Sequence, residues 1–96
     1  MKDTQKPAIT ITYCPGCKWL LRSAWMSQEL LSTFENDLAQ VTLRPSDSSG
    51  TFLITYNDLV LWDRTVNGGF PEIKELKKRV RDQLDPRRDL GHIDRG

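Results

Sequence analysis

Histidine, cysteine and net charge are all scarce in this chain of 96 residues. The formal net charge is only +1, so composition gives no argument for a nucleic-acid, membrane-surface or acidic partner. No apolar run approaches the length needed to cross a membrane, and residues 1–7 are polar and do not resemble a secretory signal. We therefore expect a cytoplasmic protein without a membrane or nucleic-acid partner, for which a permanent structural disulfide would be unusual.

The length and composition predict one small globular domain. Apolar residues make up 38% and charged residues 28% of the chain, which is ordinary for such a domain. The sequence shows no internal repeat and no sign of a second domain. We place the domain at residues 1–85 and expect a charged, flexible C-terminal tail at residues 86–96.

Both cysteines lie in the motif Cys14-Pro15-Gly16-Cys17, between an expected strand and an expected helix. The positive end of a helix dipole favours thiolate over thiol, and it should favour a more exposed Cys14 as the attacking group. The spacing of two residues lets the second thiol close back on the first. The motif therefore predicts a thiol redox centre with Cys14 and Cys17 as its catalytic residues.

The residues around the cysteines support this prediction. Pro15 can begin a helix without wasting a donor, and Gly16 has no side chain that would block an incoming disulfide. The cation of Lys18 should further favour a thiolate. Two alternatives remain: a pair of inert thiols, or half of a zinc site. His92 is the only histidine and lies in the predicted tail, so a closed zinc site would need a fourth ligand or two chains that pool their cysteines. We therefore expect no metal site.

The apolar pattern predicts six main elements. Residues 8–13 alternate as a half-buried strand, residues 41–44 form a second strand, and residues 51–56 and 59–62 form a hairpin. One helix should run from about Cys17 to Leu38, and Pro71 should open another that ends before Pro86. The core-facing stripe of the first helix is expected to contain five residues: Leu20, Ala24, Leu31, Phe34 and Leu38.

The element order β-α-β-β-β-α predicts an α/β (α+β) fold. The first strand, helix and second strand form a βαβ unit with parallel strands, to which the hairpin and the last helix are added. This arrangement is thioredoxin-like: a four-stranded mixed sheet with two helices on one face. The cysteine motif occupies the junction of the first strand and the first helix, where that fold places its redox site.

The loop Gly68-Gly69-Phe70 should return beside the cysteine turn in this topology. Glycines there would let backbone amides approach a substrate disulfide or glutathione closely. The structural alternative is that Phe70 packs as a hydrophobic staple before the last helix. The expected substrate-binding residues are therefore of two groups, around the cysteines and in this loop: Pro15, Gly16, Lys18, Gly68, Gly69 and Phe70.

Several apolar residues do not fit the expected core. Trp19, Met26 and Leu30 lie to one side of the stripe on the first helix, and the hairpin is apolar on both faces at Leu53 and Trp62. Exposed patches of this kind often mark interfaces, so we expect a homodimer or a docking partner at one of them. The alternative is a monomer in which Trp19 folds over the cysteine turn.

The motif, the long helix, the hairpin and Gly69-Phe70-Pro71-Glu72 together resemble the selenoprotein W family, the Rdx group, over residues 8–85. The resemblance implies a thioredoxin-like fold, a role in redox homeostasis and glutathione as a partner. Animal members often carry selenocysteine at the second motif position, which matches Cys17 and suggests that Cys17 is the reactive group. The choice between Cys14 and Cys17 stays open.

These observations predict a thiol–disulfide oxidoreductase that acts on protein or small-molecule thiols and disulfides. The Cys14–Cys17 pair would be its redox centre, with glutathione as a candidate partner and no other cofactor. The alternative is a binding module without turnover, in which the oxidation state of the cysteines controls partner docking.

Overall fold

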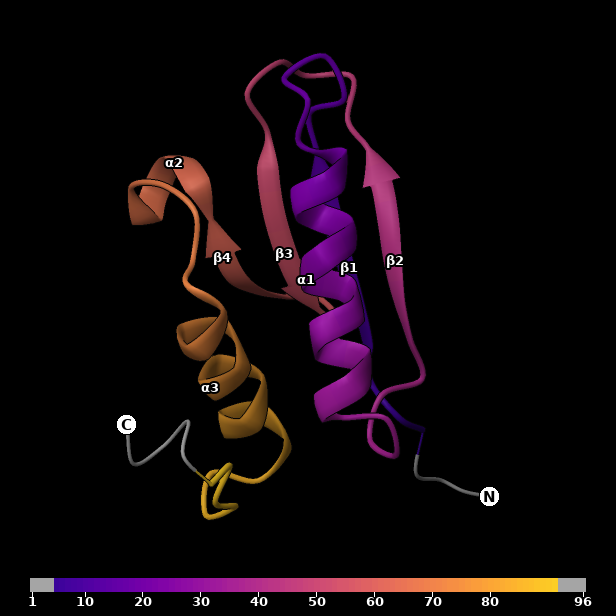
Figure 1. Cartoon of the computed structure of the whole chain (residues 1–96), viewed down its shortest axis with the longest axis vertical. Helices are drawn as coiled ribbons and strands as arrows, with labels where there is room; N and C mark the ends of the chain where they lie inside the picture. Colours follow the sequence, from indigo (N-terminus) through magenta and orange to yellow (C-terminus); the bar gives the residue numbers. More distant parts are fainter. Residues whose placement is uncertain (1–4, 92–96) are drawn as a thin grey trace.

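The computed structural model describes residues 5–91. Figure 1 shows the elements in chain order. They are β1 (Ala8–Tyr13), α1 (Leu20–Thr33), β2 (Gln40–Pro45), β3 (Phe52–Tyr56), β4 (Leu59–Asp63), α2 (Arg64–Asn67) and α3 (Ile73–Leu84). Apart from the short helix α2, which was not expected, this is the predicted order β-α-β-β-β-α.

The four strands form one mixed sheet in the order β2-β1-β3-β4. β1 pairs parallel with β2, while β3 pairs antiparallel with both β1 and β4. The hairpin turns at Asn57, whose positive φ of 52° suits the tight turn that its side chain favours. Because β1 and β2 are parallel, the loops that follow them leave the same edge of the sheet.

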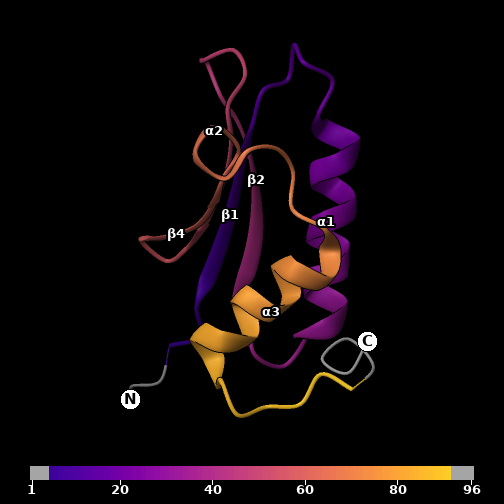
Figure 2. The ribbon, with the colours of Figure 1, turned by 90° about the vertical axis from the view of Figure 1, so that its left-hand side faces the viewer.

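One face of the sheet carries the hydrophobic core. Alternation along β1 buries Ile9, Ile11 and Tyr13 on this face, as predicted, and Ile11 is paired with the buried Ile54 of β3. Helices α1 and α3 pack against this face and touch each other (Figure 2). The predicted thioredoxin-like fold, a mixed sheet with its two main helices on one face, is confirmed.

The predicted bounds and stripe of the first helix need correction. The helix begins at Leu20 and ends at Thr33, rather than running from about Cys17 to Leu38. Phe34 and Leu38 are buried as expected, but Leu20 and Leu31 are exposed. The residues that α1 buries are Ser23, Met26, Ser27 and Leu30. The buried face is therefore rotated about the helix axis from the stripe that apolarity alone suggested.

Two serines make this rotation favourable. The Ser23 hydroxyl donates to the Trp19 carbonyl at 2.8 Å, and the Ser27 hydroxyl donates to the Ala24 carbonyl at 2.7 Å. A buried hydroxyl is costly only when it lacks a partner, and these two find theirs within the helix.

The predicted interaction patches are also corrected. Met26 and Leu30 belong to the core, so they cannot form an exposed patch with Trp19, and Trp62 is buried as well. The large apolar residues that are exposed on α1 are Leu20, Leu21, Trp25 and Leu31. A homodimer stays a prediction, but not through the residues first proposed for it on α1.

Residues 86–91, the described part of the predicted tail, contact the domain. Leu90 packs against the core, and both terminal nitrogens of the Arg88 guanidinium donate to the Asp37 carboxylate, at 2.8 and 3.1 Å. The hydrogen bonds between Arg88 and Asp37 lower the pKa of Asp37 and raise the pKa of Arg88. Over the described residues 5–91, no helix is long and apolar enough to cross a membrane.

Candidate redox site

Cys14 and Cys17 form a disulfide, with their Cα atoms 5.3 Å apart. They lie in a turn that connects β1 to α1 and is closed by a 3.1 Å hydrogen bond from the Lys18 amide to the Pro15 carbonyl. Pro15 and Gly16 are exposed at the tip of this turn, and no atom would contact a side chain added at Gly16. The motif therefore forms an intramolecular disulfide whose turn has an exposed tip.

The two sulfurs differ in environment. Cys14 is only 3% exposed, whereas Cys17 is half-buried. The expectation that Cys14 is the more exposed cysteine is wrong. The Cys17 amide donates a 3.2 Å hydrogen bond to the Cys14 sulfur. A hydrogen bond from an amide favours negative charge on its acceptor, so this one would stabilise a thiolate at Cys14.

The helix dipole acts on these sulfurs less directly than the sequence suggested. Lys18 adopts a left-handed conformation with a φ of 66°, and α1 begins only after Trp19. Cys17 therefore lies before the N-terminus of α1. The field of a helix terminus weakens with distance from that end, so the dipole acts less strongly on Cys17 than the sequence suggested. The amide hydrogen bond to Cys14 is the closer source of thiolate stabilisation.

The loop after β2 contributes residues that the sequence analysis missed. Ser46, Asp47 and Ser49 line a pocket of about 350 Å³ together with Cys14, Pro15 and Gly16. The Ser46 amide donates to the Tyr13 carbonyl at 2.7 Å, which holds this loop beside the cysteine turn. The parallel pairing of β1 and β2 was a signal for this proximity, because it brings the two following loops to one edge.

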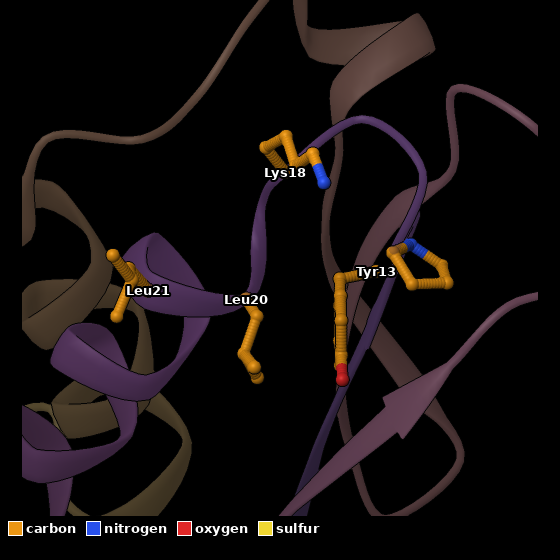
Figure 3. Close-up of a pocket in the computed structure, with 5 residues that line it drawn as sticks. Tyr13, Lys18, Leu20 and Leu21 are labelled. Carbon is orange, nitrogen blue, oxygen red and sulfur yellow. The ribbon is translucent and has the colours of Figure 1, made fainter.

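A second pocket, of about 280 Å³, also has Pro15 in its lining. Its lining is mainly apolar, with the Tyr13 hydroxyl and the Lys18 ammonium as its polar side-chain groups, and it consists of Tyr13, Pro15, Lys18, Leu20 and Leu21. Figure 3 shows the side chains of Tyr13 and Leu20 facing each other, with Lys18 at the end nearest the cysteine turn. The disulfide turn thus contributes to two pockets, of which this one has the more apolar lining.

Phe70 belongs to an aromatic cluster with Phe52 and with Trp19, which lies two residues after Cys17. Its ring centroid lies 4.9 Å from that of Trp19 and 5.0 Å from that of Phe52, in edge-to-face contacts. The guanidinium carbons of Arg22 and Arg64 lie 4.0 and 5.5 Å from the Phe70 centroid. Neither arginine pairs with a carboxylate within residues 5–91, and the buried Arg64 Nε has no hydrogen-bond partner.

The glycines of the same loop have a structural role. Gly68 and Gly69 have positive φ values of 80° and 125°, which side chains disfavour. Both amides donate to the carbonyl of Arg64, the first residue of α2, and these hydrogen bonds close the end of that helix. The Gly69 carbonyl accepts a 2.8 Å hydrogen bond from the Trp62 indole. The two amides that were expected to meet a substrate are engaged here, and substrate binding at these glycines stays a prediction.

No group of three or more metal-ligating side chains occurs among residues 5–91. His92, the histidine considered for a zinc site, lies outside the described residues. The chemistry available at the turn itself is that of a reversible disulfide.

The protein is thus a thioredoxin-like domain with a CxxC disulfide at the β1–α1 junction, and comparison with known proteins makes this class more specific. The model of the Rdx family matches residues 8–82, and this chain belongs to that family. The resemblance to the selenoprotein W group is thereby confirmed.

Two solved structures are similar along their whole length. A crystal structure from Bordetella parapertussis shares 60% sequence identity and covers 83% of this chain and 100% of its own, with a TM-score of 0.81. A selenoprotein W-related protein from Vibrio cholerae shares 52% identity and covers 84% of this chain and 100% of its own, also with a TM-score of 0.81. No curated protein matches the chain.

Proposed function

We propose that this protein is a thiol–disulfide oxidoreductase in which Cys17 exchanges with the substrate and Cys14 resolves the mixed disulfide. The observation that carries the proposal is the asymmetry of the turn. Cys17 is the more exposed sulfur, while the nearly buried Cys14 accepts the Cys17 amide hydrogen bond. Membership of the Rdx family supports a redox role for the same motif.

The reaction consists of two exchange steps. In the reduced protein, the Cys17 thiolate attacks one sulfur of a substrate disulfide, and the other substrate sulfur leaves as a thiolate. The Cys14 thiolate then attacks the Cys17 sulfur, which forms the Cys14–Cys17 disulfide and releases the second substrate thiolate. Two electrons pass from the protein to the substrate, and the protons of the two protein thiols end on the two released thiols.

The hydrogen bond to Cys14 suits this division of labour. When a thiol attacks the oxidised protein at the half-buried Cys17, Cys14 is the leaving group and departs as a thiolate that the Cys17 amide stabilises. A better stabilised leaving thiolate is displaced faster. The same interaction prepares Cys14 to attack when the protein is reduced.

Glutathione is the reductant that we propose for the reverse half of the cycle. Its carboxylates are complementary to the guanidinium groups of Arg22 and Arg64, which lie over Phe70 without a carboxylate partner within residues 5–91. Two glutathione molecules would reduce the protein disulfide and leave as glutathione disulfide. A cytoplasmic location, where glutathione is abundant, belongs to this proposal.

Single cysteine variants test the proposal. Cys14→Ser should react with a disulfide substrate but stop at a stable mixed disulfide on Cys17, which mass spectrometry of the peptide detects. Cys17→Ser should lose exchange almost completely, because only a nearly buried thiol remains. Turnover is measured as reduction of hydroxyethyl disulfide with a dithiol donor. A stable mixed disulfide on Cys14 in the Cys17→Ser variant, with none on Cys17 in the Cys14→Ser variant, would reverse the roles that we assign.

A binding module controlled by oxidation state is the second candidate, and the exposed apolar side chains on α1 favour it. In that case the wild-type protein would show no turnover with any disulfide, while its binding to a partner would differ between the oxidised and reduced forms. The same turnover assay therefore separates the two functions.

A further inference from the structure

The apolar pocket next to the disulfide turn has the size of a site for one side chain. Its volume of about 280 Å³ lies just below the range of roughly 300–1,000 Å³ that is typical of pockets for whole small molecules. Pro15 and Lys18, two of its lining residues, bracket Cys17 in the turn closed by their hydrogen bond. A side chain in this pocket would therefore lie close to the half-buried sulfur.

The apolar surface continues from the pocket along α1. Leu20 and Leu21 line the pocket and are 48% and 83% exposed, and Trp25 lies one turn further along the helix, also exposed. A small thiol would cover little of this surface. A peptide segment that places one side chain in the pocket would cover it along the helix, which favours a protein substrate over a small molecule.

The charged side chains in the pocket lining and on the first turn of α1 are basic. Lys18 lines the pocket, Arg22 lies on the first turn of α1, and that turn contains no acidic residue. The nearest acidic side chain along the helix is Glu29, which pairs with Lys77 at 2.9 Å. Asp47 lines the other pocket, which shares Pro15 with this one. The unopposed ammonium of Lys18 is complementary to a carboxylate beside the apolar guest.

A second copy of this chain is a poorer occupant. A two-fold dimer would place the same surface on both sides of the contact, so that Lys18 of one copy would face a surface whose lining holds no acid. Like charges would meet across an apolar contact, which costs binding energy. An acidic segment of a different protein has no such conflict.

We propose that this pocket binds the apolar side chain beside the reactive cysteine of a protein substrate, with Lys18 pairing to an acidic residue of the same segment. The inference rests on the proposed exchange at Cys17 and names the substrate class of that site. The exchange itself is unchanged: Cys17 attacks the substrate cysteine sulfur, and the other half of the substrate disulfide leaves as a thiolate.

Three short peptide disulfides of matched design test the proposal. Each is a symmetric dimer of a tetrapeptide: Glu-Leu-Cys-Gly, Glu-Ser-Cys-Gly or Lys-Leu-Cys-Gly. The second-order rate of oxidation of the reduced protein is measured with each. Wild type should react about tenfold faster with the Glu-Leu peptide than with the Glu-Ser peptide, because an apolar side chain is buried. Wild type should also react about fivefold faster with the Glu-Leu peptide than with the Lys-Leu peptide, because only the glutamate can pair with Lys18.

Variants assign these preferences to the pocket. Leu20→Ser should remove the preference for leucine over serine, whereas Leu59→Ser should keep it, since Leu59 is equally exposed at 48% but lies at the β3–β4 turn. Lys18→Gln should remove the preference for glutamate over lysine, whereas the exposed Lys74 on α3 provides the matched control Lys74→Gln. Equal rates for all three peptides in wild type, or loss of the preferences in the control variants, would overturn the proposal.

A binding experiment separates this inference from the exchange chemistry. The unreactive peptide Glu-Leu-Ser-Gly is titrated into the oxidised protein, and the amide signals of Leu20 and Leu21 are followed by NMR. Saturable shifts support the pocket even if the protein fails to react with hydroxyethyl disulfide, which would refute only the exchange at Cys17. Shifts that depend on protein concentration without peptide would show a second copy at this face and overturn the assigned occupant.

Discussion

Leu30 and Leu31 are neighbours on α1, yet they belong to two different surfaces. Leu30 is 0% exposed and packs in the core, whereas Leu31 is 41% exposed and lies on the same side as Leu20. The buried face includes two serines, and the exposed face includes three leucines and a tryptophan. Apolar character therefore does not determine which face of this helix meets the sheet, and the exposed apolar face is available for binding.

The largest expected effect comes from truncating each leucine in turn. Leu30→Ala should lower the free energy of unfolding by about 3 kcal/mol, because it removes a fully buried side chain and leaves a cavity. Leu31→Ala should lower it by only about 0.5 kcal/mol, as for an exposed site. Urea unfolding of both oxidised variants measures the difference. Equal losses would show that the two faces are not distinct, and a larger loss for Leu31→Ala would restore the stripe expected from sequence.

The sequence predicted the elements of this fold better than their rotations. Strict alternation in β1 and the turn residues between β3 and β4 act locally, so both features were recognised. The rotation of α1 depends on Ser23 and Ser27, whose hydroxyls bond to carbonyls of their own helix. A scale that treats serine as polar places these residues on the outside, because it does not count this internal hydrogen bond.

The same distinction applies to the candidate site. The cysteine pair and its exposed neighbours follow from a local motif, and the structure brings Cys14, Pro15, Gly16, Cys17 and Lys18 into one turn. The relative burial of the two sulfurs depends on distant chain segments, which a motif does not contain. Helix α2 escaped notice because it has only four residues, although its Asp63 cap and the left-handed Gly68 that ends it are local signals.

A smaller effect is expected at Lys18, where the chain turns before it enters α1. Its φ of 66° is strained for a residue with a side chain, and it helps to set how α1 enters the fold. Lys18→Gly should be more stable than Lys18→Ala by about 1 kcal/mol, since glycine accepts this conformation and alanine does not. Thermal unfolding of the two oxidised variants measures this. If alanine proves the more stable, the turn has relaxed to another conformation and the entry of α1 is not fixed there.

The smallest expected effect concerns the ion pair that lies just beyond the other end of α1. Arg88 hydrogen-bonds to Asp37 and lowers the pKa of its carboxyl group from the ordinary value of about 3.9. Ionised Asp37 therefore stabilises the fold above that pH, and its contribution is lost as the pH falls through the lowered pKa.

Asp37→Asn should accordingly lower the free energy of unfolding by about 0.5 kcal/mol at pH 7, a modest value because both side chains are partly exposed. The difference from wild type should vanish below the lowered pKa.

Arg88→Gln should raise the Asp37 pKa towards its ordinary value, as followed by carboxyl NMR signals. The pKa of Tyr56, which burial and the charge of Asp37 both raise, should fall in Asp37→Asn but remain above its ordinary value because the burial persists. An unchanged Asp37 pKa in Arg88→Gln would mean that residues 86–91 do not hold this contact in solution. The chain just after α1 would then be exposed to solvent, as the apolar face of the helix is.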